Sequence, residues 1–171
     1  MRNGDPHDPS LLRPAIGTAV FVLVVPDTVI GLVPFLLTGW RMQAPLLGWP
    51  PLRWLGVLLL AGGLPIFCDF ILRFVRDGRG TPAPIAPTRH LVVGGMFRFV
   101  RNPGYVAVVA MLLGQGLLFG SSAVIVYAVA IALAFHTFVV LYEEPTLRRQ
   151  FGDEYVAYCR RVRRWLPRLR R

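Results

Sequence analysis

The sequence predicts an all-α, polytopic membrane helical bundle of about four transmembrane helices, followed by a C-terminal amphipathic helix. The chain of 171 residues is 54% hydrophobic and only 16% charged, whereas a soluble domain is about a quarter charged. The charges are unevenly placed, and a long stretch from residue 105 to residue 142 has none. These observations indicate a bilayer as the solvent, and the length predicts a single domain over 1–171.

The positive charge comes entirely from arginine. The net charge is +10, and the chain has no lysine. In a membrane protein such an excess sets the orientation and contacts anionic lipid. No nucleic-acid recognition module is visible, so no nucleic acid and no obligate protein partner are expected. Cys68 and Cys159 form no Cys-x-x-Cys pair, and no metal site is predicted.

The first half of the chain predicts two spans. Residues 1–13 form a polar tail, and the apolar run 14–38 is long enough to cross a bilayer once. A loop closed by Pro50 and Pro51 follows, and residues 52–75 form the second apolar run. We therefore expect the chain to return to its starting side by residue 76.

The charge-free run 105–142 predicts a helical hairpin. As a single helix its 38 residues would extend roughly 57 Å at about 1.5 Å per residue, while one crossing needs about 20 residues. Gly120-Ser121-Ser122 is the expected corner, so the spans are 105–120 and 122–142. Gly116 and Gly120 are spaced to let the two arms pack closely.

A cytosolic amphipathic helix is predicted over 143–166. Pro145 suits a first helical turn, and arginines fill the face opposite an apolar stripe. The stripe consists of Leu147, Phe151, Tyr155, Tyr158 and Val162. Such a helix lies on the membrane surface or against the spans.

The arginines predict the topology. Four spans place both termini and the 76–104 loop on one side, together with every arginine except Arg41 and Arg53. The positive-inside rule makes that side cytoplasmic. The preference for arginine over lysine hints at a bacterial source, hence an inner membrane.

Two polar clusters lie at the cytoplasmic ends of these spans. One runs from His90 through Gly94-Gly95 to Tyr105, and the other from His136 through Glu143-Glu144 to Tyr155. The hairpin joins them, so its two feet should be neighbours in space.

These clusters resemble the isoprenylcysteine carboxyl methyltransferase family, whose relatives include phospholipid methyltransferases. Leu91-Val92, Gly95, Phe97-Arg98 and Arg101-Asn102-Pro103-Gly104-Tyr105 look like its loop signature. Glu143-Glu144 with Leu147, and Phe151-Gly152 with Tyr155 and Tyr158, are similar to its C-terminal half. The resemblance covers about residues 80–167. Asn102 stands where many members have His, and Phe97 where many have Tyr; an amide cannot carry a proton, and Phe97 cannot form a hydrogen bond.

The resemblance implies S-adenosylmethionine as cofactor and a hydrophobic or lipid-like methyl acceptor. It implies Arg101 and Glu144 as catalytic residues. The cofactor-binding residues that it implies are His90, Leu91, Val92, Gly95, Phe97, Arg101, Asn102, Pro103, Tyr105, His136, Glu143 and Glu144.

The residue chemistry agrees with such a site. Arg101 offers a planar fork for a carboxylate. Glu143 or Glu144 accepts from ribose hydroxyls or holds an ammonium group, and Gly94-Gly95 permits close backbone approach. Phe97 and Tyr105 can flank an adenine or a lipid chain. The acceptor atom, whether carboxylate, amine or thiol, is not predicted.

Simpler interpretations stay open for several of these residues. Arg101 can extend to lipid headgroups, and the Glu143-Glu144 pair can serve only the dipole of the next helix. His136 can be a bundle histidine, and His90 a loop residue. We interpret the two glycines of Gly114-Gln115-Gly116 as residues that let neighbouring helices pack closely.

Two carboxylates lie inside predicted spans, where they are costly and usually paired. Asp69 has Arg73 one turn away, which predicts a structural ion pair. Asp27 has no local partner, and its role is not predicted.

Two other functions remain possible at this stage. Membrane sterol or ene reductases share related C-terminal architecture and bind NAD(P)H, but they are typically longer. A small transporter or lipid-binding protein would explain Asp27 and Asp69 but not the paired motifs.

Overall fold

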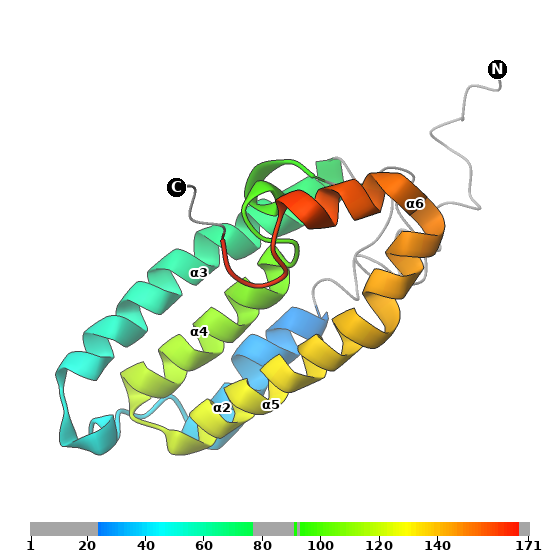
Figure 1. Ribbon diagram of the computed structural model, residues 1–171. Coiled ribbons are helices and arrows are strands. Elements are labelled where there is room, and N and C mark those ends of the chain that lie inside the picture. Colours follow the sequence, from blue (N-terminus) through cyan, green and yellow to red (C-terminus); the bar gives the residue numbers. More distant parts are fainter. Residues whose placement is uncertain (1–23, 77–90, 92, 168–171) are drawn as a thin grey trace, which may run out of the picture.

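The computed structural model describes residues 24–76, 91 and 93–167, and the side chains of 74–76 are not described (Figure 1). This part of the chain is helical and contains no strand, apart from one isolated parallel bridge between Val100 and Arg163. The elements, in chain order, are η1 Asp27–Leu32, α2 Val33–Thr38, η2 Leu46–Gly48, α3 Pro51–Arg76, η3 Gly95–Arg98, α4 Pro103–Phe119, α5 Ser122–Phe138, η4 Val139–Glu143 and α6 Glu144–Arg161. The all-α prediction is confirmed for these residues.

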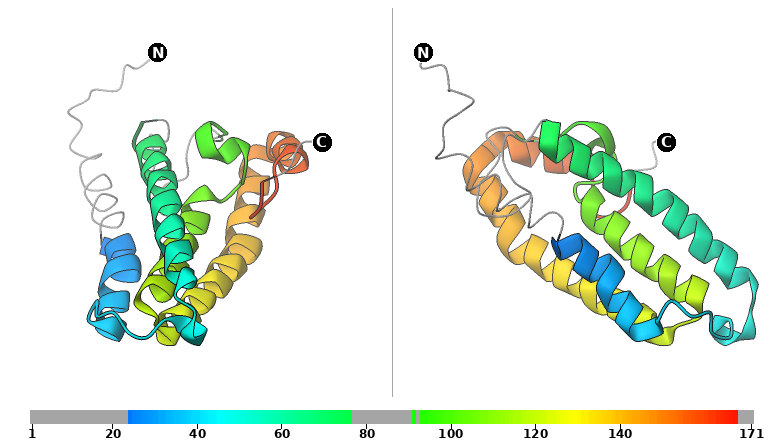
Figure 2. Two further views of the ribbon diagram at one scale, coloured as in Figure 1. Left: turned by 90° about the vertical axis from the view of Figure 1, so that its left-hand side faces the viewer. Right: turned by 180° about the vertical axis from the view of Figure 1, so that it is seen from behind.

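Helix α4 is the centre of the bundle. It packs along α3 on one side and α5 on the other, and it also contacts η1 and α2 (Figures 1 and 2). Its buried residues include Ala107, Leu112 and Gln115, the last of which donates from Nε2 to the carbonyl oxygen of Ile30 at 2.8 Å. A helix that is apolar all round is expected in this central place.

Glycines bring α3 and α4 close together. A Cβ added at Gly56 would lie 2.7 Å from the carbonyl oxygen of Gly114, and one added at Gly63 would lie 2.8 Å from Cγ of Met111. Small residues at such contacts allow close backbone approach. The expectation that Gly114 serves helix packing is confirmed.

The corner of the α4–α5 hairpin lies at Gly120 and Ser121, within the Gly120-Ser121-Ser122 corner that the sequence predicts. Gly120 has a φ of 73° and ends α4, and the hydroxyl of Ser121 caps α5 by accepting from the amide of Val124 at 3.4 Å. At Gly116 an added Cβ would lie 2.6 Å from Cδ1 of Ile125. Gly116 therefore packs the two arms together, while Gly120 makes the turn.

The outer surface suits lipid. Two helices, Pro51–Arg73 and Ser122–Arg161, are long and apolar enough to cross a membrane, whereas Val24–Thr38 and Pro103–Phe119 are shorter apolar helices. The predicted count of four spans thus stays a prediction, and the expected tail 1–13 and residues 14–23 of the expected span 14–38 lie outside the described residues. Large apolar side chains are nevertheless exposed on α3 and α5, for example Leu58 and Leu133.

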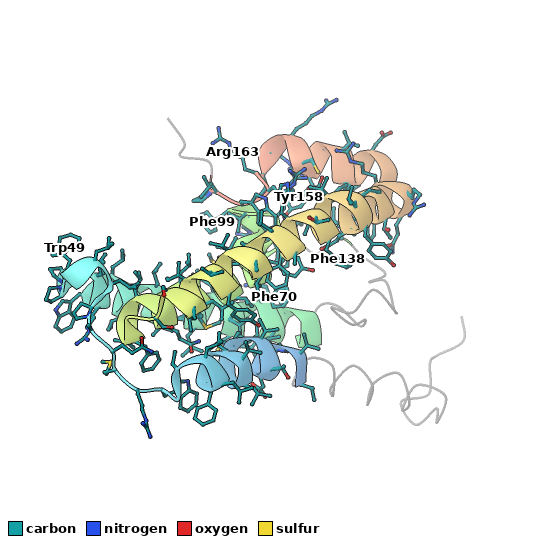
Figure 3. All side chains as sticks on the ribbon, turned by 90° about the horizontal axis from the view of Figure 1, so that it is seen from below. Trp49, Phe70, Phe99, Phe138, Tyr158 and Arg163 are labelled. Carbon is teal, nitrogen blue, oxygen red and sulfur yellow. The ribbon has the colours of Figure 1, made fainter. Side chains whose placement is uncertain are left out.

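Exposed tryptophans mark one end of the bundle. Trp40, Trp49 and Trp54 are all more than half exposed and belong to the connection between α2 and α3 and to the start of α3. Figure 3 shows Trp49 at one end and Tyr158 and Arg163 at the other. Tryptophan is enriched where a membrane meets water, which fits an interface at that end.

The C-terminal helix differs from the prediction. It ends at Arg161 rather than at residue 166, and Gly152 interrupts it with a φ of 49° and a ψ of −125°. Val162 is extended, and residues Val162–Trp165 return toward the start of α4, where Val100 bridges Arg163. We call Val162–Trp165 the return segment. The helix ends early because these backbone groups pair with a distant part of the chain.

Candidate functional site

The two feet of the hairpin meet, as the sequence predicts. The hydroxyl of Tyr105, in the first turn of α4, donates to Oε2 of Glu143 at 3.1 Å. The ring of Tyr105 also lies against that of Phe135, with centroids 4.6 Å apart. The start of α4 and the α5–α6 junction therefore form one site.

Glu144 is the centre of a buried cluster of charges. The residue is only 6% exposed. Its Oε1 accepts from Nε of Arg164 at 2.6 Å, and its Oε2 accepts from Nη2 of the same arginine at 2.9 Å. Nη1 of Arg101 lies 3.2 Å from Oε1. Glu144 therefore binds two arginines and does not line the neighbouring cavity.

Arg101 is held in place but incompletely paired. Its Nη1 also contacts Sγ of Cys159 at 2.7 Å, while its Nε is buried without a hydrogen-bond partner. The backbone amide of Arg101 donates to the carbonyl oxygen of Arg163 at 2.9 Å. An unpaired buried donor is costly, so this Nε is a candidate for ligand binding.

The return segment also fixes Asn102. The side-chain Nδ2 of Asn102 donates to the carbonyl oxygen of Arg164 at 3.3 Å. Pro103 then begins α4, and a Cβ added at Gly104 would lie 2.9 Å from ring atoms of Phe70. Asn102 thus sits where η3, α4 and the return segment meet.

The two adjacent glutamates have opposite electrostatic environments. Burial would raise the pKa of the Glu144 carboxyl, but the hydrogen bonds from Arg164 and the charge of Arg101 hold that pKa below its ordinary value. Burial raises the pKa of Glu143, the hydrogen bond from Tyr105 opposes the rise, and the charge of Glu144 adds to it. Glu144 is therefore a stable carboxylate, whereas Glu143 binds a proton more readily.

A cavity of about 280 Å³ lies inside the bundle next to these groups. We call it the Arg101 cavity. Its polar end is formed by Arg101, Asn102, Tyr105 and Glu143, and its other walls are mostly apolar. Those walls consist of Val25, Pro26, Val29, Phe67, Phe70, Ile71, Phe97, Pro103, Gly104, Val108, Phe135 and Phe138. Its volume is near the lower end of the range of roughly 300–1,000 Å³ for small-molecule sites.

The cavity unites half of the expected cofactor-binding residues. Those on its wall are Phe97, Arg101, Asn102, Pro103, Tyr105 and Glu143. Phe97 is fixed through its carbonyl oxygen, which accepts from the hydroxyl of Tyr158 at 2.7 Å.

Other expected residues lie elsewhere. Leu91 packs against the buried cluster of Tyr155, Tyr158 and Val162. Gly95, with a φ of 53°, lies against the guanidinium of Arg73. His90 and Val92 lie outside the described residues.

His136 lines a separate groove. This groove, of about 460 Å³, runs between α3, α4 and α5, and Tyr105 and Phe135 separate it from the Arg101 cavity. Nε1 of Trp165 donates to Nδ1 of His136 at 3.2 Å. The structure therefore pairs His136 with the return segment instead of placing it among the residues of the Arg101 cavity.

The two carboxylates inside predicted spans, Asp69 and Asp27, have different surroundings. Nε of Arg73 lies 3.0 and 2.9 Å from the two oxygens of Asp69, and the amide of Met96 lies 3.4 Å from Oδ2 of Asp69. The predicted structural pair is confirmed, and it also anchors η3. Asp27 is exposed in the first turn of η1.

Sequence reasoning missed Arg164 and Cys159. Arg164 contacts the side chain of Glu144, and Cys159 contacts that of Arg101, yet in the sequence both are only part of a basic tail. Their contacts depend on the kink at Gly152 and on the return segment, which no local pattern predicts. The glycine at position 104, between Pro103 and Tyr105, was the feature of the sequence that could have indicated a close contact, because a Cβ there would meet the ring of Phe70.

The fold and site define a helical membrane protein with a buried, arginine-bearing cavity at one end of the bundle. The family model described as phospholipid methyltransferase matches residues 52–154. The chain belongs to this family, and it is accordingly a membrane methyltransferase. The match includes α3, η3, α4, α5 and the first part of α6, and so all residues at the polar end of the Arg101 cavity.

One relative is similar to the chain over a shorter stretch. A protein of Haemophilus influenzae (strain ATCC 51907 / DSM 11121 / KW20 / Rd), described as uncharacterized, is 36% identical over 62 residues. These residues are 36% of the present chain and 98% of the relative. No solved structure matches the chain.

Proposed function

We propose that the protein transfers a methyl group from S-adenosylmethionine to a hydrophobic or lipid-like acceptor at the cytoplasmic face of the membrane. One observation carries the proposal. A buried arginine, Arg101, has an unpaired Nε and borders a cavity in a chain of the phospholipid methyltransferase family.

The residues of the cavity match the chemical groups of this cofactor. Arg101 suits the carboxylate of the amino-acid end, because a guanidinium binds a carboxylate through parallel hydrogen bonds. Glu143 can accept from the ammonium group or from the ribose hydroxyls, and Asn102 offers a neutral amide. The rings of Phe97, Tyr105 and Phe135 are suited to an adenine face.

S-adenosylmethionine would supply an electrophilic methyl group, which an acceptor displaces in line. The task of the chain is then to orient the reactants and to exclude water. Arg101 is held through its backbone amide and through Cys159, and Tyr105 is held by Glu143 and Phe135. These contacts would orient a ligand in the cavity. Glu143, with its raised pKa, is suited to hold a proton of the acceptor.

The setting favours an acceptor from the bilayer. The walls of the Arg101 cavity away from its polar end are almost entirely apolar, and α3 and α5 expose large apolar side chains around them. Whether the acceptor atom belongs to a carboxylate, an amine or a thiol stays open.

The distribution of the arginines supports a particular orientation of the protein in the membrane. We propose a single domain with both termini and the 76–104 segment in the cytoplasm, in a bacterial inner membrane. Arg41 and Arg53 are then the arginines on the far side. Their location agrees with the exposed Trp40 and Trp54 beside them, which suit the opposite membrane interface.

Titration calorimetry of the purified protein in detergent tests the cofactor. We expect saturable binding of S-adenosylmethionine and no heat of binding with NADPH. Binding of NADPH alone would favour a reductase, and binding of neither would favour a non-enzymatic lipid-binding protein. Either result would reject the proposal.

A further inference from the structure

Glu144 is shared unequally between its two arginines. Arg164 binds both carboxylate oxygens, at 2.6 and 2.9 Å, whereas Arg101 makes one contact of 3.2 Å to one of them. A fork-to-fork pair of this kind is the stronger geometry. Glu144 is therefore primarily the partner of Arg164, and Arg101 is its second partner.

The cluster consequently keeps one positive charge. Two guanidinium groups face one carboxylate, and the unpaired Nε belongs to Arg101, the arginine that borders the cavity. Arg164 does not line the cavity. Because Arg101 is largely buried, with 12% of its side chain exposed, solvent screens this charge weakly.

We propose that Arg164 is a positioning residue that occupies Glu144 and thereby keeps Arg101 available to an anionic group of the ligand. The inference rests on the proposed function, since it assumes that the ligand in the cavity carries a carboxylate. Without Arg164, both oxygens of Glu144 can turn to Arg101 and form a neutral pair. The cavity would then lose its positive charge although every residue on its wall is unchanged.

The return segment gives Arg164 its place. The carbonyl oxygens of Arg163 and Arg164 accept from the backbone of Arg101 and from the side chain of Asn102. The backbone of the return segment thus holds the loop before α4. The side chain of Arg164 sets the net charge of the cluster that it forms with Glu144 and Arg101. These two roles can be separated by substitutions that leave the backbone intact.

Four variants separate the backbone role of the return segment from the charge role of the Arg164 side chain. They differ in the net charge of the cluster of Arg101, Glu144 and Arg164. The charge is +1 in the parent, 0 in Arg164→Gln, and +1 again in the double variant Glu144→Gln/Arg164→Gln. Arg164→Lys keeps the charge of +1 with a single point charge in place of the fork. Arg163→Gln is the matched control, because it removes one positive charge from the adjacent, exposed side chain.

Titration of these variants with S-adenosylmethionine in detergent is the first measurement. We expect Arg164→Gln to bind at least about tenfold more weakly, as for loss of a charge-assisted hydrogen bond. The double variant should recover to within about twofold of the parent, the scatter of unrelated sites, and Arg163→Gln should equal the parent. Arg164→Lys should lie closer to the parent than to Arg164→Gln.

Recovery in the double variant is the decisive result, because loss of the anchor between Arg164 and Glu144 predicts no recovery. If Arg164 only anchored the return segment, removing its partner Glu144 as well would not restore binding. A folded Arg164→Gln variant that binds like Arg163→Gln would overturn the proposal. A double variant as weak as Arg164→Gln would overturn it too.

The alkylation rate of Cys159 provides a readout that needs no cofactor. Nη1 of Arg101 contacts its sulfur, so the alkylation rate reports a change in the position of Arg101 relative to this thiol. In a Cys68→Ser background, iodoacetamide should modify Arg164→Gln at a rate that differs from the parental rate, and the double variant at the parental rate. Equal rates in all three would overturn the proposal. If the parent fails to bind S-adenosylmethionine, the proposed function fails, while these rates still decide whether Arg164 controls Arg101.

Discussion

Tyr105 and Glu143 join the two feet of the α4–α5 hairpin through a hydrogen bond of 3.1 Å. The two residues are 38 positions apart in the chain, and both line the Arg101 cavity. The next residue, Glu144, does not line the cavity, and its carboxylate binds Arg101 and Arg164. Two adjacent glutamates therefore have separate surroundings, one on the wall of the Arg101 cavity and one between two arginines.

Glu143→Gln should weaken S-adenosylmethionine binding by about 1.5–3 kcal/mol, the range for a hydrogen bond that involves a charged group. The amide oxygen can still accept from Tyr105, so the melting temperature should change little. Calorimetric titration measures the loss, and Glu154→Gln, on the exposed side of α6, is the control. If both variants bind S-adenosylmethionine as tightly as the parent, Glu143 interacts only with the helix dipole and not with the cofactor.

Gly56→Ala should destabilise the protein by about 1–3 kcal/mol, the usual cost of overpacking. The added Cβ would lie 2.7 Å from the backbone oxygen of Gly114, which cannot rotate away. The control is Gly62→Ala on the same helix, where nothing lies within 4 Å of the added Cβ; it should be neutral or stabilise by up to about 1 kcal/mol. Thermal unfolding in detergent compares them, and equal melting temperatures would contradict the α3–α4 contact.

The stability difference between the parent and Glu144→Gln should shrink as the pH falls. The arginines hold the pKa of Glu144 below its ordinary value of 4.5, so the contribution of its carboxylate is fully present above that value. It is lost as the pH falls through the lower pKa of the folded state. Glu143 has the opposite shift, but both proteins retain it, so its effect largely cancels.

Melting temperatures of the two proteins between about pH 7 and pH 3 measure this difference. A difference that stays constant over the whole range would show that Glu144 carries no charge of consequence in the folded protein.

Much of this fold could be predicted because apolar length is a local property. The charge-free run 105–142 is too long for one crossing, and its corner at Gly120 follows from that fact and from the turn residues. The meeting of the two feet follows from the hairpin. Likewise Asp69 and Arg73 are one turn apart, so their pair could be predicted from spacing.

The remaining features depend on pairing between distant segments. The end of α6 at Arg161, the kink at Gly152 and the bridge from Arg163 to Val100 have no local signal. The π-helical turns at Asp27–Leu32 and Val139–Glu143 are likewise invisible to a hydrophobic pattern of period 3.6. For this reason Arg164 could not be recognised, and Glu144 was expected at a ligand although it binds two arginines.

The topology predicts where reporter domains will lie. Fusions after Gly48 and after Arg171 should report opposite sides of the membrane, with the C-terminal fusion in the cytoplasm. The physical reason is that the four predicted spans put Arg41 and Arg53 on the side of Gly48 and every other arginine on the side of Arg171. Paired phosphatase and fluorescent-protein reporters make the measurement, and equal sidedness would reject the four-span arrangement.

The most direct test of the central claim is methyl transfer by the parent and by Arg101→Lys, using S-adenosylmethionine labelled in the methyl group and bacterial lipid extract as acceptor. The account predicts that label enters an organic-soluble product with the parent. It also predicts that Arg101→Lys folds normally but transfers at least about tenfold less, equivalent to about 1.4 kcal/mol, because lysine cannot form the planar fork. A raised KM for the cofactor alone would assign Arg101 to the cofactor carboxylate, and a raised KM for the lipid alone to an acidic acceptor. If the parent transfers no label, or if Arg101→Lys matches it with both constants unchanged, the assignment of this cavity as the methyl-transfer site is wrong.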